Sequence, residues 1–209
     1  MRGFSRPSFV VASLTMWELV SQPRNLDGYT LGMQKIVVAG PSGAGKSTIA
    51  RKIAERLDIP YAELDAMYHG PNWTKIPEFE KDVDQLTAQH AWITEWQYDD
   101  VRPLLLARAD TFVWLDLPFP LILWRVTVRT VRRALTHEAL WGGNHESPLH
   151  KIFTDKSNMI RWSIASRNQI RDALPTIIRE YPDLRIVRLR SRRQVKQLLE
   201  VLERSATSD

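Results

Sequence analysis

The apolar residues of this chain fall first into a short continuous run and then into a helical stripe. Residues 35–39 form an apolar, β-branched run that predicts a buried strand. The next apolar positions, Ile49, Ile53 and Leu57, recur every fourth residue and predict a helix over residues 47–57. A strand, a glycine-rich turn and a helix therefore follow one another in the order of a βα unit.

The rest of the chain continues this alternation of strands and helices. Further strands are predicted at residues 61–64, 92–95, 111–115 and 185–189, and further helices at 77–90, 121–140, 156–174 and from Ser191, where Ser191 and Gln194 form a capping box. Alternating strands and helices predict an α/β fold, a mostly parallel five-stranded sheet sandwiched by helices. The two helices before the last strand form a helical excursion from the sheet.

The first 32 residues differ from the rest, because they carry Gly, Pro, Ser and Asn without a clear period. Met33 stands directly before the first predicted strand. We therefore expect residues 1–32 to be a disordered extension and residues 33–209 to be one domain. A secretory signal around residues 9–14 is the rival interpretation, but the apolar run is short and no convincing cleavage pattern follows.

Composition and charge narrow the function classes. The chain has 44% hydrophobic and 25% charged residues, and no apolar run approaches the roughly 18 residues of a membrane span. It has no cysteine, which excludes disulfides, thiolate metal ligands and cysteine nucleophiles. The net charge of +5 raises the question of nucleic acid. Residues 121–171 alone carry +6, so the positive charge is concentrated in the helical excursion.

Residues 40–48 read Gly-Pro-Ser-Gly-Ala-Gly-Lys-Ser-Thr and fit the phosphate-loop pattern between a strand and a helix. In such a loop the backbone N–H groups and the helix N-terminus surround phosphates, Lys46 reaches the β and γ oxygens, and Ser47 ligates magnesium. A turn without function needs no lysine and hydroxyl in that order. The predicted ATP and Mg²⁺ contacts are Gly40, Ser42, Gly43, Ala44, Gly45, Lys46, Ser47 and Thr48.

Two aspartates follow predicted strands, at the sheet edge where ligands bind in open α/β folds. Asp65 could orient or deprotonate an attacking hydroxyl or hold a magnesium-bound water, and the alternative is a helix or turn cap. Asp116 is compatible with a magnesium-organising acid and equally with a cap. We take Asp65 as a candidate catalytic residue and leave both interpretations of Asp116 open.

Four arginines, Arg125, Arg129, Arg132 and Arg133, share one face of the predicted helix at 121–140. Such a stripe can close over a transferring phosphate and neutralise its charge, so Arg129 and Arg132 are further catalytic candidates beside Lys46. A solvated face or a grip on nucleic acid phosphates are the alternatives.

The phosphate loop and the blocks at residues 64–73, 94–98, 114–118 and 140–144 together resemble bacterial adenylate-kinase-like P-loop kinases, including those labelled topology modulation proteins. The resemblance covers residues 33–202 and extends to the wider group of nucleoside monophosphate, shikimate and gluconate kinases. It implies a helical lid at about residues 126–159. It also implies that the loop with Arg190 and Arg192 contacts adenine.

The chain departs from this group in its acceptor region. Glu95-Trp-Gln-Tyr stands where an Asp-Gly-Phe-Pro-Arg block is expected, and residues 66–91 contain no arginine. The predicted acceptor pocket lies between Asp65 and Glu95, and a nucleoside-like or other weakly charged hydroxyl acceptor is expected somewhat ahead of AMP. Its candidate residues are Asp65, Tyr68, Trp73, Glu95, Gln97 and Arg102.

The sequence therefore predicts a cytoplasmic, ATP- and Mg²⁺-dependent phosphotransferase that acts on a nucleotide or another small hydroxyl compound, as a monomer or homodimer. The alternative is a nucleic-acid-associated P-loop ATPase that affects DNA topology, and a non-catalytic nucleotide sensor is a third possibility. Positive charge confined to the lid, and the lack of a separate DNA-reading motif, favour the kinase.

Overall fold

The computed structural model describes residues 32–145 and 159–206, in which strands and helices alternate. The strands are β1 (Lys35–Ala39), β2 (Trp92–Glu95), β3 (Thr111–Leu115) and β4 (Arg185–Leu189). The α-helices are α2 (Lys46–Leu57), α3 (Leu64–Tyr68), α4 (Phe79–Thr87), α5 (Arg102–Arg108), α6 (Phe119–Thr136), α7 (Met159–Ala165), α8 (Gln169–Glu180) and α9 (Arg192–Ala206). Two short 3-10 helices, η1 (Pro71–Trp73) and η2 (Trp141–Gly143), complete this part of the chain.

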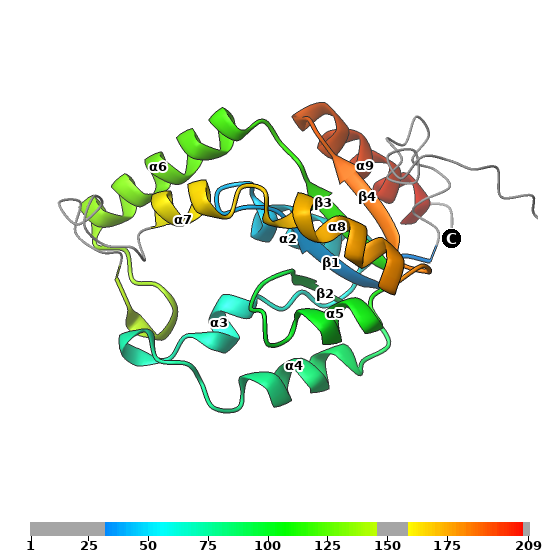
Figure 1. The fold of residues 1–209 in the computed structure, drawn as a ribbon, viewed down its shortest axis with the longest axis horizontal. Coiled ribbons are helices and arrows are strands. Elements are labelled where there is room, and N and C mark those ends of the chain that lie inside the picture. Colours follow the sequence, from blue (N-terminus) through cyan, green and yellow to red (C-terminus); the bar gives the residue numbers. More distant parts are fainter. Residues whose placement is uncertain (1–31, 146–158, 207–209) are drawn as a thin grey trace, which may run out of the picture.

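The four strands form one parallel sheet in the order β2-β1-β3-β4. Successive residues of β1 are buried on opposite faces, since Ile36 and Val38 pack into one apolar cluster and Val37 and Ala39 into another. Helices α2 and α9 supply the first cluster, and α4, α5 and α8 supply the second (Figure 1). The predicted α/β sandwich is confirmed, with its core on both faces of the sheet.

The strand predicted at 61–64 is wrong, so the sheet has four strands and not five. Tyr61 makes only an isolated parallel bridge to Ile93, and the chain then turns into α3 at the buried Leu64. Leu64 and the next four residues, Asp-Ala-Met-Tyr, form α3 instead of a strand. In this helical turn Leu64, Met67 and Tyr68 pack into the second apolar cluster, and Asp65 lies outside it. The strands at 92–95, 111–115 and 185–189 are confirmed.

The helices differ from the prediction mainly at their ends. Helix α6 begins earlier than expected, directly after Pro118, and the predicted helix at 156–174 is two helices, α7 and α8, within the described residues. Helix α5 was not predicted, because its single apolar stripe is short and begins with Arg-Pro. At the start of α9 the Gln194 N–H donates to Ser191 Oγ at 3.2 Å, as a capping box requires.

The predicted lid is partly described. Helix α6 projects from the sheet with α7 beside it, and the chain after α6 returns toward the segment after α3 (Figure 1). We call residues 139–145 the lid turn and residues 69–75 the acceptor segment. Residues 146–158 of the predicted lid, and residues 1–31 of the predicted extension, lie outside the described residues. None of the described helices has the length and apolar character needed to cross a membrane.

Candidate functional site

A cavity of about 790 Å³ lies at the carboxyl edge of the sheet, where β1 runs into the phosphate loop and β2 ends. We call it the main cavity. It brings together the loop, the segments after α3 and β2, and parts of α6, α7 and α8. The sequence-predicted residues that line it are Gly40, Ser42, Gly43, Gly45, Lys46, Ser47, Thr48, Asp65, Trp73, Glu95, Gln97, Arg102 and Arg129.

The phosphate loop is held against the lid helix. Gly43 has φ +88°, and a Cβ there would lie 2.8 Å from the Ile122 carbonyl oxygen and 3.0 Å from Val126 Cβ. Both the backbone conformation and the close approach to α6 therefore require glycine at this position. The Ala44 N–H donates to the Pro41 carbonyl at 3.0 Å and closes the turn before α2 begins.

Lys46 is buried beside a carboxylate at the floor of the main cavity. Its Nζ lies 3.9 Å from Glu95 Oε2, and the two side chains are 9% and 2% exposed. Burial lowers the pKa of Lys46, while the charges of Glu95 and then Asp65 act in the opposite direction. Tyr61 donates its hydroxyl to Glu95 Oε1 at 2.8 Å, so the second carboxylate oxygen is also occupied. The lysine charge is thus balanced by acids in a site largely screened from water.

Asp65 lies in the first turn of α3 and not at the end of a strand, but it still faces the main cavity. Tyr98 Oη is 2.6 Å from Asp65 Oδ1 and 3.1 Å from His69 Nε2. Burial and the Asp65 charge raise the pKa of Tyr98, so the phenol keeps its proton and donates it to Asp65. His69 then donates through Nε2. This series of hydrogen bonds fixes one carboxylate oxygen of Asp65 and leaves the other for a ligand.

The arginines of α6 divide between the site and the surface. Arg129 donates to Ser42 Oγ at 2.9 Å, and Arg133 lines the main cavity close to the ring of Trp141. Arg132, which the sequence also predicted as catalytic, is 67% exposed and pairs with Glu138 at 3.1 Å. One helical face therefore carries Arg129 and Arg133 inward, while the structure does not bring Arg132 to the cavity.

Arg125 lies beside the loop and not in the main cavity. Its Nη1 donates to the Ala44 carbonyl at 3.4 Å. Burial lowers the pKa of Arg125, and the neighbouring charge of Arg192 lowers it further. The predicted adenine loop thus places Arg192 near α6, whereas Arg190 lines a different cavity.

Arg102, the acceptor candidate outside the arginine-free segment, does reach the main cavity. Its guanidinium lies 4.2 Å from the ring centroid of Trp96 and pairs with Asp99. Burial lowers the pKa of Arg102, which Asp99 opposes. Helix α5, which the sequence interpretation missed, positions it there.

Besides Arg132, Arg190 and Arg192, two further predicted residues, Tyr68 and Ala44, do not line the main cavity in the described structure. Tyr68 stacks on Tyr98 with ring centroids 3.9 Å apart and meets Phe79 edge-on, so it supports the wall from behind. Ala44, within the loop itself, is buried in the first apolar cluster. Residues that line the cavity without having been assigned to it include Trp96, Tyr98, Arg133, Trp141, Trp162 and Gln169. Several of them lie in the aromatic-rich blocks at residues 94–98 and 140–144, which was the signal in the sequence that could have identified them.

The lid turn docks onto the acceptor segment at the outer end of the main cavity. Trp73 N–H donates to Asn144 Oδ1 at 3.0 Å, and Asn144 Nδ2 donates to the Gly70 carbonyl at 2.8 Å. Gly142 lies so close that a Cβ there would be 2.5 Å from the Gly70 carbonyl carbon. The structure therefore closes the cavity with two segments that are far apart in the sequence.

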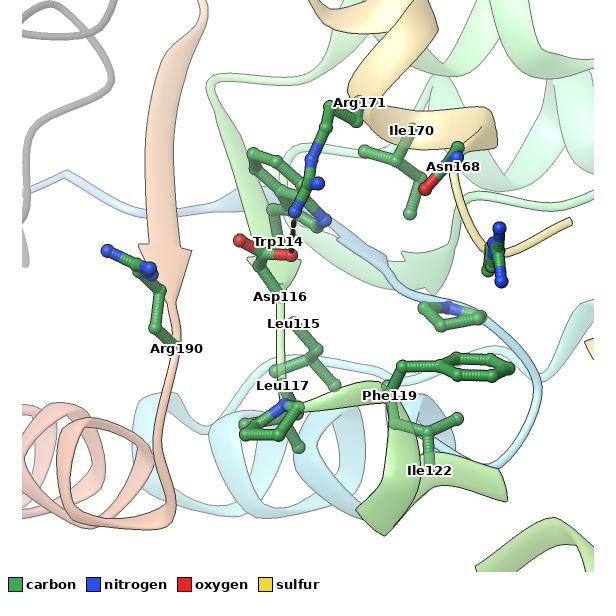
Figure 2. A pocket seen from close by; sticks show the side chains of 13 residues that line it. Trp114, Leu115, Asp116, Leu117, Phe119, Ile122, Asn168, Ile170, Arg171 and Arg190 are labelled. Carbon is green, nitrogen blue, oxygen red and sulfur yellow. Dashed lines mark hydrogen bonds and ion pairs between the residues drawn. The ribbon is translucent and has the colours of Figure 1, made fainter. Parts of the chain in front are cut away.

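Asp116 lies in a second cavity of about 420 Å³, between the end of β3 and the start of α8. Figure 2 shows Arg171 directed at the Asp116 carboxylate, with Asn168 and Ile170 beside it. Arg171 lies 3.3 Å from Asp116 Oδ1, and Arg188 pairs with Oδ2. Since two arginines hold the carboxylate and no side chain caps α6, the structure favours neither of the two interpretations given by the sequence.

No group of three or more His, Asp or Glu side chains among residues 32–145 and 159–206 could hold a metal ion by itself. The Ser47 hydroxyl and the carboxylates of Asp65 and Glu95 nevertheless line one cavity. Oxygen donors of this kind, few in number and completed by water and phosphate, are what Mg²⁺ accepts.

Comparisons with known proteins find sequence similarity in the part of the chain that carries the phosphate loop. The Cytidylate kinase family model matches residues 36–105. The bifunctional pantoate ligase/cytidylate kinase of Gloeobacter violaceus is 39% identical over 103 residues, which are 46% of this chain and 19% of that protein. The cytidylate kinase of Alkaliphilus oremlandii is 62% identical over 34 residues, 16% of each chain. The chain thus spans less than a fifth of the length of either relative.

Among solved structures, a shikimate kinase from Acinetobacter baumannii in complex with shikimate is 18% identical, with a TM-score of 0.48 over 88% of this chain and 98% of that one.

Proposed function

We propose that this chain, a member of the P-loop nucleoside monophosphate and shikimate kinase-like group, transfers the γ-phosphoryl group of ATP to a small hydroxyl-bearing acceptor. The observation that carries the proposal is the position of Lys46. This loop lysine lies at the floor of a cavity that also holds Asp65, Glu95 and Arg129. A cation for the phosphate and an acid for the acceptor hydroxyl thus face the same space.

The loop and α2 are suited to the phosphates of ATP. The N-terminus of α2 opens onto the loop, where backbone N–H groups and the helix dipole favour anions. Lys46 would neutralise charge on the β and γ oxygens in place of its Glu95 contact. Arg129, already bonded to Ser42 of the loop, would stabilise the charge that develops during transfer. Because ATP is a cytoplasmic substrate, we expect the proposed activity in the cytoplasm.

Magnesium is part of this proposal. Ser47 would hold the ion directly, and Glu95 through water, since one or two protein oxygens suffice for Mg²⁺. When bound, the ion would supply positive charge to the phosphate oxygens.

The transfer itself needs only one proton acceptor from the chain. The acceptor oxygen would form a bond to the γ phosphorus as the bond between that phosphorus and the β–γ bridging oxygen breaks, and ADP would leave. Where the attacking oxygen is a hydroxyl, its proton would pass to Asp65, whose other oxygen is held by Tyr98. An ionised phosphate oxygen of a nucleotide acceptor would attack without this proton transfer.

The acceptor region suits a compound that carries a planar ring. Trp73, Tyr98 and Trp141 line the main cavity, and such rings offer stacking area. His69 Nδ1 and Gln97 Oε1 are screened from solvent without a hydrogen-bond partner in the described residues, so polar groups of a ligand or water would have to meet them.

The positive side chains of the main cavity bear on whether the acceptor is a nucleotide or an uncharged compound. Arg102 and Arg133 both line the main cavity, which supports a nucleotide acceptor more strongly than the arginine-free segment 66–91 suggested. An uncharged hydroxyl compound remains within the proposal.

No observation favours the nucleic-acid alternative. The arginines that could have formed a basic surface stripe, Arg125, Arg129 and Arg133, instead contact the loop or line the main cavity. An oligonucleotide phosphate chain binds to exposed cations.

The test is acceptor-dependent ADP release from MgATP with CMP, AMP, cytidine, adenosine, shikimate and gluconate as candidate acceptors, and with duplex DNA in a separate arm. We expect ADP release to rise by at least tenfold over the acceptor-free rate with a ring-bearing compound of the first four. Stimulation by DNA alone, with no acceptor active, would contradict the proposal and restore the ATPase alternative.

A further inference from the structure

Two tryptophans from distant parts of the chain line the outer end of the main cavity. Trp73 ends η1 in the acceptor segment, and Trp141 begins η2 in the lid turn. The ring of His69 meets Trp73 edge-on, with centroids 5.0 Å apart, and lies tilted to Trp141 at 6.1 Å. This aromatic wall exists only while the two segments are in contact.

The side chain of Asn144 joins the backbones of both tryptophans. Its Oδ1 accepts the Trp73 N–H at 3.0 Å, and its Nδ2 donates to the Trp141 carbonyl at 2.6 Å and to the Gly70 carbonyl at 2.8 Å. The residue is 6% exposed. Both amide hydrogens and the amide oxygen therefore have partners in a site shielded from water, where a lost partner is costly.

Each of the two segments is also closed by its own backbone. In the lid turn the Leu140 N–H donates to the Asn144 carbonyl at 2.7 Å, and Ala139 bridges to His145. In the acceptor segment the Gly70 N–H donates to the Thr74 carbonyl at 2.8 Å. Two preformed turns thus dock as units, so a single side chain at their junction can set the spacing of the wall.

We propose that Asn144 is a positioning residue of the acceptor site, which acts by holding Trp73 and Trp141 at the spacing that a ring-bearing acceptor requires. This inference rests on the proposed function, because it assigns the aromatic wall to the acceptor. Asn144 bonds only to the lid turn and the acceptor segment in the described structure. Its loss weakens binding of the acceptor and leaves binding of ATP at the loop unchanged.

The test compares Asn144→Asp with Asn168→Asp. The first substitution keeps the oxygen that accepts the Trp73 N–H. It replaces the amide NH₂ group, which donates to the carbonyls of Gly70 and Trp141, by a carboxylate oxygen that cannot donate. The second makes the same chemical change at an exposed residue before the first turn of α8, where aspartate is well tolerated. The side chain of Asn168 lines the second cavity and not the main cavity. ATP binding and the melting temperature of each variant report whether the fold is intact.

Two measurements then separate docking from catalysis. Amide hydrogen exchange in the ligand-free protein follows the Trp73 N–H, and calorimetric titration with CMP and with cytidine follows the acceptor site without any turnover. Where wild type turns over CMP, its KM and kcat are measured as well.

We expect Asn144→Asp to speed exchange at Trp73 and to weaken binding of the nucleotide or nucleoside probe, each by about tenfold or more. ATP affinity and kcat at saturating acceptor stay within about twofold of wild type, and Asn168→Asp matches wild type throughout. Unchanged exchange at Trp73, or faster exchange with unchanged probe binding, would overturn the inference, as would a wild type that binds neither probe. A wild type that binds a probe without phosphorylating it would remove the proposed function and leave the positioning role of Asn144 standing.

Discussion

Gly142 offers the sharpest perturbation of the docked lid turn, because a neighbouring glycine serves as its control. Gly142 has φ +65° and Gly143 has φ +74°, so alanine at either site suffers a similar backbone strain of about 1–2 kcal/mol. Their surroundings differ. A Cβ at Gly142 would lie 2.5 Å and 2.6 Å from the carbonyl carbon and oxygen of Gly70, whereas a Cβ at Gly143 would have no atom within 4 Å.

The difference between the two variants measures the docking contact alone. The Gly70 carbonyl is backbone and cannot rotate away from the new methyl group, so the lid turn must shift or separate from the acceptor segment. Separation breaks two hydrogen bonds across the junction, from Trp73 N–H to Asn144 and from Asn144 to Gly70. At about 0.5–1.5 kcal/mol each, Gly142→Ala should cost roughly 1–3 kcal/mol of docking free energy beyond Gly143→Ala.

Amide hydrogen exchange at Trp73 is the assay, since that N–H is bonded only while the turn is docked. A docking loss of this size corresponds to exchange roughly five- to 150-fold faster in Gly142→Ala than in Gly143→Ala. Equal exchange in the two variants would show that the Gly70 contact does not oppose a methyl group at Gly142, because backbone strain alone would then explain both.

Three other predictions concern the main cavity. Arg129→Ala should lower kcat at least tenfold and weaken ATP binding much less, whereas Arg132→Ala should stay within about twofold of wild type in a steady-state assay. Asp65→Asn should lower kcat by about a hundredfold, with Asp58→Asn on the surface as the control, and a loss below threefold would exclude a general base. Because burial lowers the pKa of His69 below 6.5, stability should fall as the pH falls through the interval beneath that value. His69→Phe should show a smaller difference in unfolding free energy between pH 7.5 and pH 5, and an unchanged difference would contradict this.

The central strands and the phosphate loop could be predicted because their signals are local. The apolar run of β1 and the Gly-Lys-Ser spacing after it lie within 14 consecutive residues, 35–48, and neither depends on a distant contact. The strand order β2-β1-β3-β4, by contrast, depends on which face of the sheet each connecting helix covers, and no local pattern predicts it.

The acceptor side was harder to predict, because it is assembled from separate segments. The apolar run at 61–64 suggested a strand, but whether an edge segment pairs fully depends on its neighbour, and Tyr61 makes only one bridge. Asn144 and Trp73 lie 71 positions apart, so no local pattern announces their hydrogen bond. Helical spacing placed four arginines on one face, but it does not tell which of them reach the cavity. Arg132 and Arg133 both pair with Glu138, yet Arg133 lines the main cavity and Arg132 is 67% exposed.

The measurement that tests the account most directly is transfer of label from [γ-³²P]ATP to the acceptor, resolved from free phosphate, in wild type and in Lys46→Ala. We predict that wild type places the label on a small hydroxyl compound, and that Lys46→Ala loses transfer by at least about a thousandfold while its melting transition remains cooperative. Wild-type label found only in free phosphate, or a Lys46→Ala variant that transfers at the wild-type rate, would contradict it.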